Sequence, residues 1–368
     1  MRPTWADIDL EAIKHNVQEI SQVVSPAILC AVVKADGYGH GAIPVARAAV
    51  SAGAKWLAVA LVEEGIALRE AGIEAPILLL SEPRPREMVQ VAEYGLRPAV
   101  YSGEGIAAAA AAATQVNKEI HVHLKIDTGM RRVGVDPDLA LTLAQAISEK
   151  SSLILDGLWT HCAVADNPSN PFTAKQLARF DEVVKKIRAE GISSNMLHSA
   201  NSALAINNPE GRFDLVRCGL AVYGLSPLEG IDAVLDLRPA MKVRSEVSYV
   251  KTIEAGEGVS YGLSWAAQQS TKLATVPMGY ADGLRRDAGH RGGEVLIGGK
   301  RYPIVGNVTM DQFLVDCGEN EVASGDEVVI LGPQGDDHIS AAEWAEIFET
   351  ITYEIICGIE SRIPRRYS

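Results

Sequence analysis

Short apolar runs alternate with helical patterns through the first 225 residues, and this alternation limits the possible folds more than any other feature. The runs lie at 27–33, 56–62, 76–80, 96–100, 120–126, 153–160, 196–199 and 215–217. Most of the segments between them place apolar residues at helical spacing, as at 63–72, 138–150 and 173–191. Eight strand–helix units in about 225 residues are typical of a (β/α)₈ barrel, so we predict an α/β fold of that class.

The pattern changes from about residue 234. Strand-like runs at 242–253, 271–280, 301–310, 312–318 and 326–332 are separated by glycine-rich turns, and one helical stretch follows at 340–351. We therefore predict two domains, a barrel over 1–233 and a mostly antiparallel β domain over 234–368. The first ten residues alternate apolar and polar side chains, and we expect them to add a strand to the second domain.

Composition and charge narrow the range of partners. The 368 residues carry a net charge of −13 and contain no extended basic cluster, which argues against nucleic acid or an anionic membrane as a partner. The start has no apolar segment typical of a secretory signal, and the alanine-rich stretch 105–117 is too short to span a membrane. We therefore expect a cytoplasmic protein that acts on a small molecule.

Cysteine and histidine spacing gives no sign of a metal site. The five cysteines are isolated and odd in number, which favours a reducing compartment over a disulfide framework or a zinc site. His121 and His123 share one face of a predicted strand, but no third ligand lies nearby in the sequence. We interpret these two histidines as structural and predict no metal.

Polar residues follow the carboxyl ends of the predicted barrel strands, where the catalytic groups of this fold lie. They are Lys34 and Tyr38, the stretch 125–134, His161, and the stretches 198–202 and 217–224. The last two supply hydroxyls, glycines and backbone N–H groups after the seventh and eighth strands, where this fold tends to bind phosphate. A lysine beside a phosphate anchor favours pyridoxal 5′-phosphate held as a Schiff base.

The stretch 31–41, "AVVKADGYGHG", closely resembles the cofactor-lysine signature of the alanine racemases. Further motifs of that family follow in its order: "DTGMRRVG", "THCAVAD", "HSANSA", "VRCGLAVYG", "VSYGLSW", "MGYADGLRR", "GNVTMDQ" and "TYEIICGIESRIPR". The resemblance covers the whole chain. It implies a (β/α)₈ barrel with a β domain, in agreement with the pattern of apolar runs.

The resemblance also implies which residues hold pyridoxal 5′-phosphate. Lys34 matches the Schiff-base lysine, Arg217 the residue that faces the pyridine nitrogen, and His161 the residue that orients this arginine. The remaining cofactor contacts match Tyr38, Asn201, Ser202, Gly219, Leu220 and Tyr353. Because an arginine keeps its proton, it cannot protonate that nitrogen, which suits proton exchange without transamination.

The resemblance further implies a substrate site. Arg132 matches the arginine near the substrate carboxylate, and Lys125 matches a lysine that the family often carries as a carbamate paired to that arginine. Tyr280 and Met310 match residues that shape the pocket for the carboxylate and methyl groups of the substrate. Two positions depart from the family pattern, since Arg131 and Thr309 stand where many members have a small residue and a cysteine.

Racemisation requires a proton to leave one face of a planar intermediate and return on the other. The resemblance assigns these steps to Lys34 on the D-face and Tyr261 on the L-face, with Tyr261 contributed by the partner subunit of a homodimer. Both groups have high unperturbed pKa values, so we expect the cations Arg217 and His161 to lower the pKa of each base.

Three alternatives to an alanine racemase stay open. A decarboxylase of the same architecture would place a glutamate where this chain has Arg217, and a non-catalytic cofactor-binding protein would lack the second domain with Tyr261. A racemase for serine or for several amino acids differs only in discriminating a methyl from a hydroxymethyl group, which is worth a few kcal/mol. The cellular role, either the supply of D-alanine for peptidoglycan or the breakdown of D-alanine, follows from the family alone.

Overall fold

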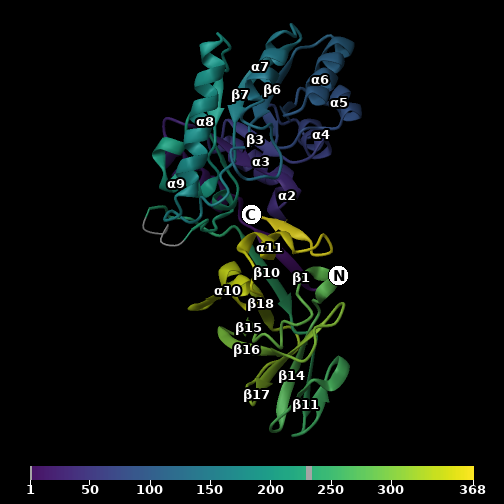
Figure 1. The fold of residues 1–368 in the computed structure, drawn as a ribbon. Helices are drawn as coiled ribbons and strands as arrows, with labels where there is room; N and C mark the ends of the chain where they lie inside the picture. The colour runs from purple at the N-terminus through teal and green to yellow at the C-terminus, as the bar shows by residue number, and fades with distance from the viewer. Residues whose placement is uncertain (1, 229–233) are drawn as a thin grey trace. The chain divides into compact units, whose positions relative to one another are not determined.

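The computed structural model describes residues 2–228 and 234–368, which form two compact units (Figure 1). We call Glu11–Gly37 with Ala42–Arg238 the barrel unit, and Met1–Leu10 with Tyr38–Gly41 and Pro239–Ser368 the β unit. The predicted domain boundary at 233 lies outside the described residues. Each unit is described by itself below.

The barrel unit contains a sheet of eight parallel strands in the order β8-β7-β6-β5-β4-β3-β2-β9. The strands are β2 (Ile28–Val32), β3 (Trp56–Val59), β4 (Ile77–Leu79), β5 (Arg97–Val100), β6 (Ile120–Lys125), β7 (Leu153–Trp159), β8 (Met196–His198) and β9 (Leu215–Cys218). Backbone N–H groups of Asp214 and Arg217 donate to Leu197 and Ala200 (3.0 and 2.9 Å) and bridge the seam between β8 and β9. All eight predicted strands are present, which confirms the predicted α/β barrel.

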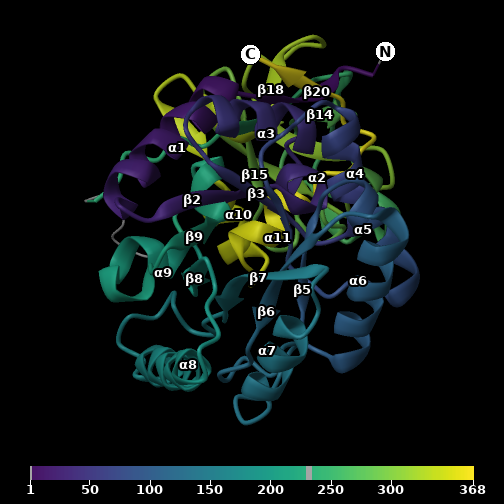
Figure 2. The same cartoon turned by 90° about the horizontal axis from the view of Figure 1, so that it is seen from above.

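The longer helices, such as α6 (Gly103–Val116), α7 (Ala140–Ser148) and α8 (Phe172–Ala189), lie outside the strands in the view from above (Figure 2). The other helical elements of this stretch are α1 (Leu10–Val24), α2 (Lys34–Tyr38), α3 (Ala42–Ser51), α4 (Val62–Glu70), η1 (Pro85–Glu87), α5 (Met88–Glu93), α9 (Ser202–Asn207), η2 (Pro209–Gly211) and η3 (Leu220–Tyr223). The alanine-rich α6 begins at Ser102, whose hydroxyl accepts from Gly105 N–H (2.9 Å), and ends at Asn117 in a left-handed conformation.

The β unit is built on a sheet in the order β11-β14-β17-β16-β15-β18-β10-β1-β20, with β19 paired to β18. Its strands are β1 (Thr4–Ile8), β10 (Met241–Glu246), β11 (Tyr249–Ile253), β14 (Thr271–Val276), β15 (Glu294–Ile297), β16 (Lys300–Val305), β17 (Phe313–Gly318), β18 (Glu327–Gln334), β19 (Asp337–Ile339) and β20 (Arg365–Tyr367). Pairing is antiparallel except between β1 and β20, which confirms a mostly antiparallel domain.

Two details of the β unit differ from the predictions. The run 242–253, predicted as one strand, divides into β10 and β11, which pair with different neighbours in the sheet. The predicted helix 340–351 ends early, because Glu349 adopts a left-handed φ of 54° that a right-handed helix cannot contain.

Short elements complete the β unit: β12 (Gly258–Val259), η5 (Tyr261–Leu263), β13 (Trp265–Ala266), η6 (Tyr280–Asp282), α10 (Ala341–Ile347) and α11 (Thr352–Cys357). Across both described stretches of the chain, the helices are too short or too polar for any of them to cross a bilayer.

Candidate active site

Lys34 begins a strained turn directly after β2. Ala35, Asp36 and Gly37 have φ values of 52°, 50° and 61°, and Tyr38 and Gly39 follow with 53° and 81°, so five consecutive residues have a positive φ. A left-handed conformation costs an L-residue about 1–2 kcal/mol, and such strain is concentrated at functional sites. The Glu64 carboxylate holds the turn, because one oxygen accepts from Ala35 N–H (2.6 Å) and the other from Ala60 N–H (2.8 Å).

Arg217 projects from β9 and is buried. Its guanidinium donates to His198 Nδ1 (2.8 Å), His161 Nδ1 (3.2 Å), and the carbonyls of Thr160 and Ser199 (3.0 Å each). The ion pairs found among the described residues do not include Arg217, so neutral acceptors alone surround this cation. Burial lowers the pKa of Arg217 to about 10, which leaves the guanidinium charged at neutral pH.

His161, Lys125 and Arg132 line one small pocket in the barrel unit, together with Thr160. Burial and the charge of Arg217 lower the pKa of His161 well below its usual value. The expectation that His161 acts as a cation is therefore wrong, because the cost of burying the charge keeps the imidazole neutral. Burial, followed by the charges of Arg217 and Arg132, also lowers the pKa of Lys125 to about 7.

The ends of β8 and β9 bring small donors together. Ser202 Oγ accepts from Gly219 N–H (3.0 Å), so a hydroxyl and a backbone turn meet at this point. Leu220 begins η3, where the first N–H groups have no acceptor within the helix. The Asn201 side chain accepts from Leu204 N–H (3.0 Å) and caps α9, which fixes the position of Ser202.

The other five predicted site residues belong to the β unit. The rings of Tyr38 and Tyr353 lie 6.0 Å apart between centroids, and Tyr38 is buried. Tyr280 and Met310 are also close, because Tyr280 N–H donates to Thr309 and Ala281 N–H donates to the Met310 carbonyl (2.9 and 3.1 Å).

Tyr261 lies in η5 and is 70 % exposed. Asn307 Nδ2 donates to the Tyr261 carbonyl (2.7 Å), and the Asn307 carbonyl accepts from Ser260 Oγ (2.5 Å). These bonds tie the backbone of η5 to the segment that leads to Met310. The tyrosine side chain therefore extends from a fixed backbone into solvent.

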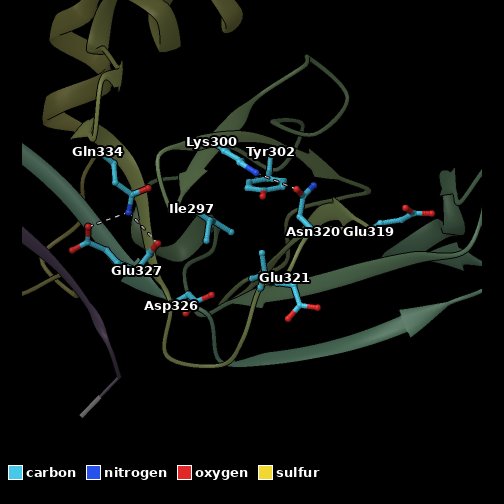
Figure 3. A pocket seen from close by; sticks show the side chains of 11 residues that line it. Ile297, Lys300, Tyr302, Glu319, Asn320, Glu321, Asp326, Glu327 and Gln334 are labelled. Atoms are coloured by element: carbon cyan, nitrogen blue, oxygen red, sulfur yellow. Dashed lines mark hydrogen bonds between the residues drawn. The ribbon is translucent and has the colours of Figure 1, made fainter.

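A pocket of about 620 Å³ in the β unit contains none of the predicted residues (Figure 3). Its wall carries four carboxylates and one lysine, Lys300, which donates to Asn320 Oδ1 (3.4 Å). Gln334 donates to Glu327 across another side of this pocket (3.2 Å). The pocket therefore has no part in the candidate site.

Trp159, at the end of β7, is a residue of the site that the sequence did not predict. Arg217 Cζ lies 4.6 Å and Lys125 Nζ 4.2 Å from the centroid of the Trp159 ring, so both cations contact its face. His198 stacks on the same ring, with centroids 5.4 Å apart. The only signal in the sequence was an aromatic residue at a strand end, and that pattern is more typical of a core residue.

Comparisons with known proteins agree with this geometry. Residues 8–227 match the N-terminal domain of alanine racemase, and residues 240–367 match its C-terminal domain. The alanine racemase of Symbiobacterium thermophilum is 44 % identical over 368 residues, covering 100 % of this chain and 97 % of the relative. That of Carboxydothermus hydrogenoformans is 42 % identical over 369 residues, covering 100 % of both chains.

Solved structures give the same result. The crystal structure of alanine racemase from a D-cycloserine-producing Streptomyces lavendulae has a TM-score of 0.94 and 40 % identity, covering 100 % of this chain and 97 % of that one. A histidine racemase from Leuconostoc mesenteroides has a TM-score of 0.90 at 28 % identity, covering 100 % and 98 %. The chain belongs to the alanine racemase family, with both of that family's domains present.

Proposed function

We propose that the chain interconverts L-alanine and D-alanine with pyridoxal 5′-phosphate. The observation that carries this proposal is the buried Arg217, a cation that contacts neutral acceptors on β9, which pairs with β2, the strand that leads to Lys34 in its strained turn. An arginine at this place separates a racemase from a decarboxylase, which would need a carboxylate there. The relatives named alanine racemase across the full chain support the same substrate.

The donors on each unit fit the cofactor. Ser202, Gly219 and Leu220 offer a hydroxyl and backbone N–H groups, while Tyr38 and Tyr353 offer phenols, and neutral donors of this kind suit a phosphate dianion. Lys34 would hold the cofactor covalently. When bound, the cofactor withdraws electrons from the α-carbon of the amino acid, so that its α-proton can leave.

The residues of the chain would then move the proton. Lys34 serves the D-face and Tyr261 the L-face, since one base cannot remove and return a proton on opposite faces. Arg217 would keep its own proton and would leave the ring nitrogen of a bound cofactor unprotonated. The ring would then be a weaker acceptor of electrons, which would favour return of the proton over side reactions.

A homodimer would complete the site. Tyr261, Leu263 and Met310 are 70 %, 67 % and 52 % exposed, an unusual state for large apolar side chains. A second copy of the chain that covered these residues would bring Tyr261 to the partner's Lys34. Each site would then need both subunits.

Lys125 is a candidate for carbamylation. Its pKa of about 7 leaves a large fraction of neutral amine at neutral pH, and only the neutral amine adds to CO₂. The addition releases one proton and creates an anion beside Arg132, which shares the pocket. Incubation with ¹³C-labelled CO₂ should give one carbamate carbon signal that is absent from Lys125→Met.

The direct test is the formation of D-alanine from L-alanine by the purified protein, with L-serine, L-arginine and L-histidine as competing substrates. A clear preference for alanine supports the proposal, and equal rates on serine would favour a broad-specificity racemase. The similarity to a histidine racemase favours a racemase of broader specificity as the second candidate function. A cytoplasmic role in supplying D-alanine for peptidoglycan is part of the proposal.

A further inference from the structure

A chain of buried polar side chains runs through the barrel unit from Arg217. Arg217 Nη1 lies 2.8 Å from His198 Nδ1, and His198 Nε2 lies 3.0 Å from His123 Nδ1. His123 Nε2 then faces Asp156 Oδ2 at 3.6 Å, which is too long for a hydrogen bond but close enough for an electrostatic contact. Four strands, β9, β8, β6 and β7, contribute one side chain each.

Because arginine can only donate hydrogen bonds, Arg217 determines which nitrogen of each histidine donates and which accepts. A guanidinium only donates, so His198 Nδ1 must be unprotonated and its single proton must lie on Nε2. That proton is donated to His123 Nδ1, which places the proton of His123 on Nε2, facing Asp156. Burial lowers the pKa of both histidines, and each is therefore a neutral imidazole with a defined tautomer.

Asp156 is held at the end of the chain as a carboxylate. Arg97 Nη1 pairs with its Oδ2, and Asn195 Nδ2 donates to its Oδ1 (2.7 Å). Burial alone would raise the pKa of Asp156, but contacts with His123, Asn195 and Arg97 lower it. The carboxylate therefore stays charged and can accept but not donate.

The backbone is shaped to bring this carboxylate to His123. The register between β6 and β7 shifts at Asp156, because Val122 pairs with Leu155 and His123 pairs with Gly157. Such a bulge changes the direction of one side chain. Gly157 leaves room for the imidazole, since a Cβ at this residue would lie 2.3 Å from His123 Nδ1.

We propose that Asp156 is a positioning residue for Arg217, acting through His123 and His198, whose tautomers Arg217 and Asp156 set from the two ends of the series. The link to catalysis rests on the proposed function, in which Arg217 faces the cofactor ring. The assignment of the tautomers does not rest on the proposed function. With Asp156 present, the His123 Nε2 proton faces a carboxylate at electrostatic distance (3.6 Å). Without Asp156, the charge of Arg97, which lowers the pKa of His123, is no longer balanced at this end. Arg97 and Arg217 then favour opposite orders of donors and acceptors, and the share of His198 with an N–H that opposes Arg217 rises.

The first experiment measures the tautomers in the wild-type holoenzyme by ¹⁵N NMR of labelled histidine. Protonated and unprotonated ring nitrogens have well-separated shifts. We expect His198 and His123 each to carry one proton on Nε2 at neutral pH. A proton on Nδ1 of either residue, or two protons on either, would overturn the proposal, whatever substrate the protein uses and whether or not any variant folds.

The second experiment compares Asp156→Ala, Asp156→Asn and the control His121→Ala. His121 Nδ1 also lies 3.6 Å from Asp156 Oδ2 but has no place in the chain to Arg217. We expect Asp156→Ala to move part of the protons from Nε2 to Nδ1 and to lower kcat by about 10- to 100-fold, a usual cost of losing an orienting partner, with KM little changed.

Asp156→Asn still offers an amide oxygen to His123, so it should keep the wild-type tautomers and most of the activity. His121→Ala should behave as wild type in both measurements. A purely structural role for Asp156 would lower stability while leaving the tautomers of the folded protein unchanged. That result, or equal losses of kcat in Asp156→Ala and His121→Ala, would contradict the proposal.

Discussion

The buried candidate residues of the barrel unit and the exposed candidate residues of the β unit lie in opposite environments. In the barrel unit, Arg217 and Lys125 contact the face of Trp159, Arg217 donates to His161, and burial lowers the pKa of all three groups. In the β unit, Tyr261 and Met310 are exposed, and Asn307 bonds the backbone of Tyr261. The barrel unit thus sets the chemistry of its groups by burial, whereas these two side chains of the β unit lie in solvent. Substitutions in the barrel should change stability together with activity, and those on the β unit should change activity alone.

The largest effect is expected for Lys34→Ala in the barrel unit. Racemisation should fall by at least about 10²–10⁴-fold, because the variant loses a positioned base as well as the covalent link to the cofactor. Borohydride should fix the cofactor to the wild type but not to the variant, measured by absorbance after denaturation. Lys185→Ala, at an exposed position of α8, is the control. Full fixation of the cofactor in Lys34→Ala would show that another lysine binds it.

Tyr261→Phe tests whether the exposed tyrosine of the β unit acts as a base. Removal of the α-proton from L-alanine should slow by about 10²–10⁴-fold, and removal from D-alanine should slow much less, measured by uptake of solvent deuterium. The free energy of unfolding should change by less than about 0.5 kcal/mol, since the side chain is exposed. Tyr249→Phe is a matched control, because this exposed tyrosine lies in the same unit. Equal losses for the two enantiomers would remove the assignment of Tyr261 to one face.

Lys125→Met tests whether burial lowers the pKa of Lys125 in the folded protein. The pKa of Lys125 is about 7 in the folded protein, below the value of about 10.4 for an unperturbed lysine. Between these two pH values, the amine of Lys125 is protonated in the unfolded chain and neutral in the folded protein. The free energy of unfolding of the wild type, relative to that of Lys125→Met, should therefore rise from pH 7 to pH 10. The rise should be of the order of 3 kcal/mol, measured by denaturant unfolding in CO₂-free buffer. A difference that does not vary with pH would mean that Lys125 titrates normally.

The smallest effect concerns the left-handed turn after Lys34. Ala35→Gly should relieve strain and stabilise the protein by up to about 1 kcal/mol, after allowing for the entropy of glycine. Ala111→Gly, on the exposed face of α6, should instead destabilise it by about 0.5–1 kcal/mol. Thermal unfolding shows whether each substitution raises or lowers the stability of the protein. A destabilised Ala35→Gly would show that the turn is not strained in solution.

The pattern of apolar runs predicted the barrel well, because strands buried on both faces need continuous apolar stretches. Lys34 and Arg217 could also be predicted, since each stands at a strand end. His123 and Asp156 could not be linked, because their contact depends on a shifted register between β6 and β7. An aspartate inside the apolar run 153–160 was the available signal, since a buried charge requires partners.

Other features had weaker signals in the sequence. Ala35 gives no sign of a left-handed turn, because alanine normally avoids that conformation, and Asp36 beside it is only a weak signal, since aspartate adopts it occasionally. The exposure of Tyr261 depends on how η5 is held by residues nearly fifty positions away. The neutrality of His161 follows from its burial beside Arg217, which a linear pattern cannot show.

The central claim is that Lys34 and Tyr261 from different chains form one site, and mixed dimers test it most directly. Inactive Lys34→Ala and inactive Tyr261→Ala subunits are mixed, and their exchange is verified by mass spectrometry. If each site uses both chains, a mixed dimer has one site with both defects and one intact site. Racemisation of alanine should then return to about a quarter of the wild-type rate at equal random mixing. No recovery after complete exchange would place both bases in one chain and contradict the account.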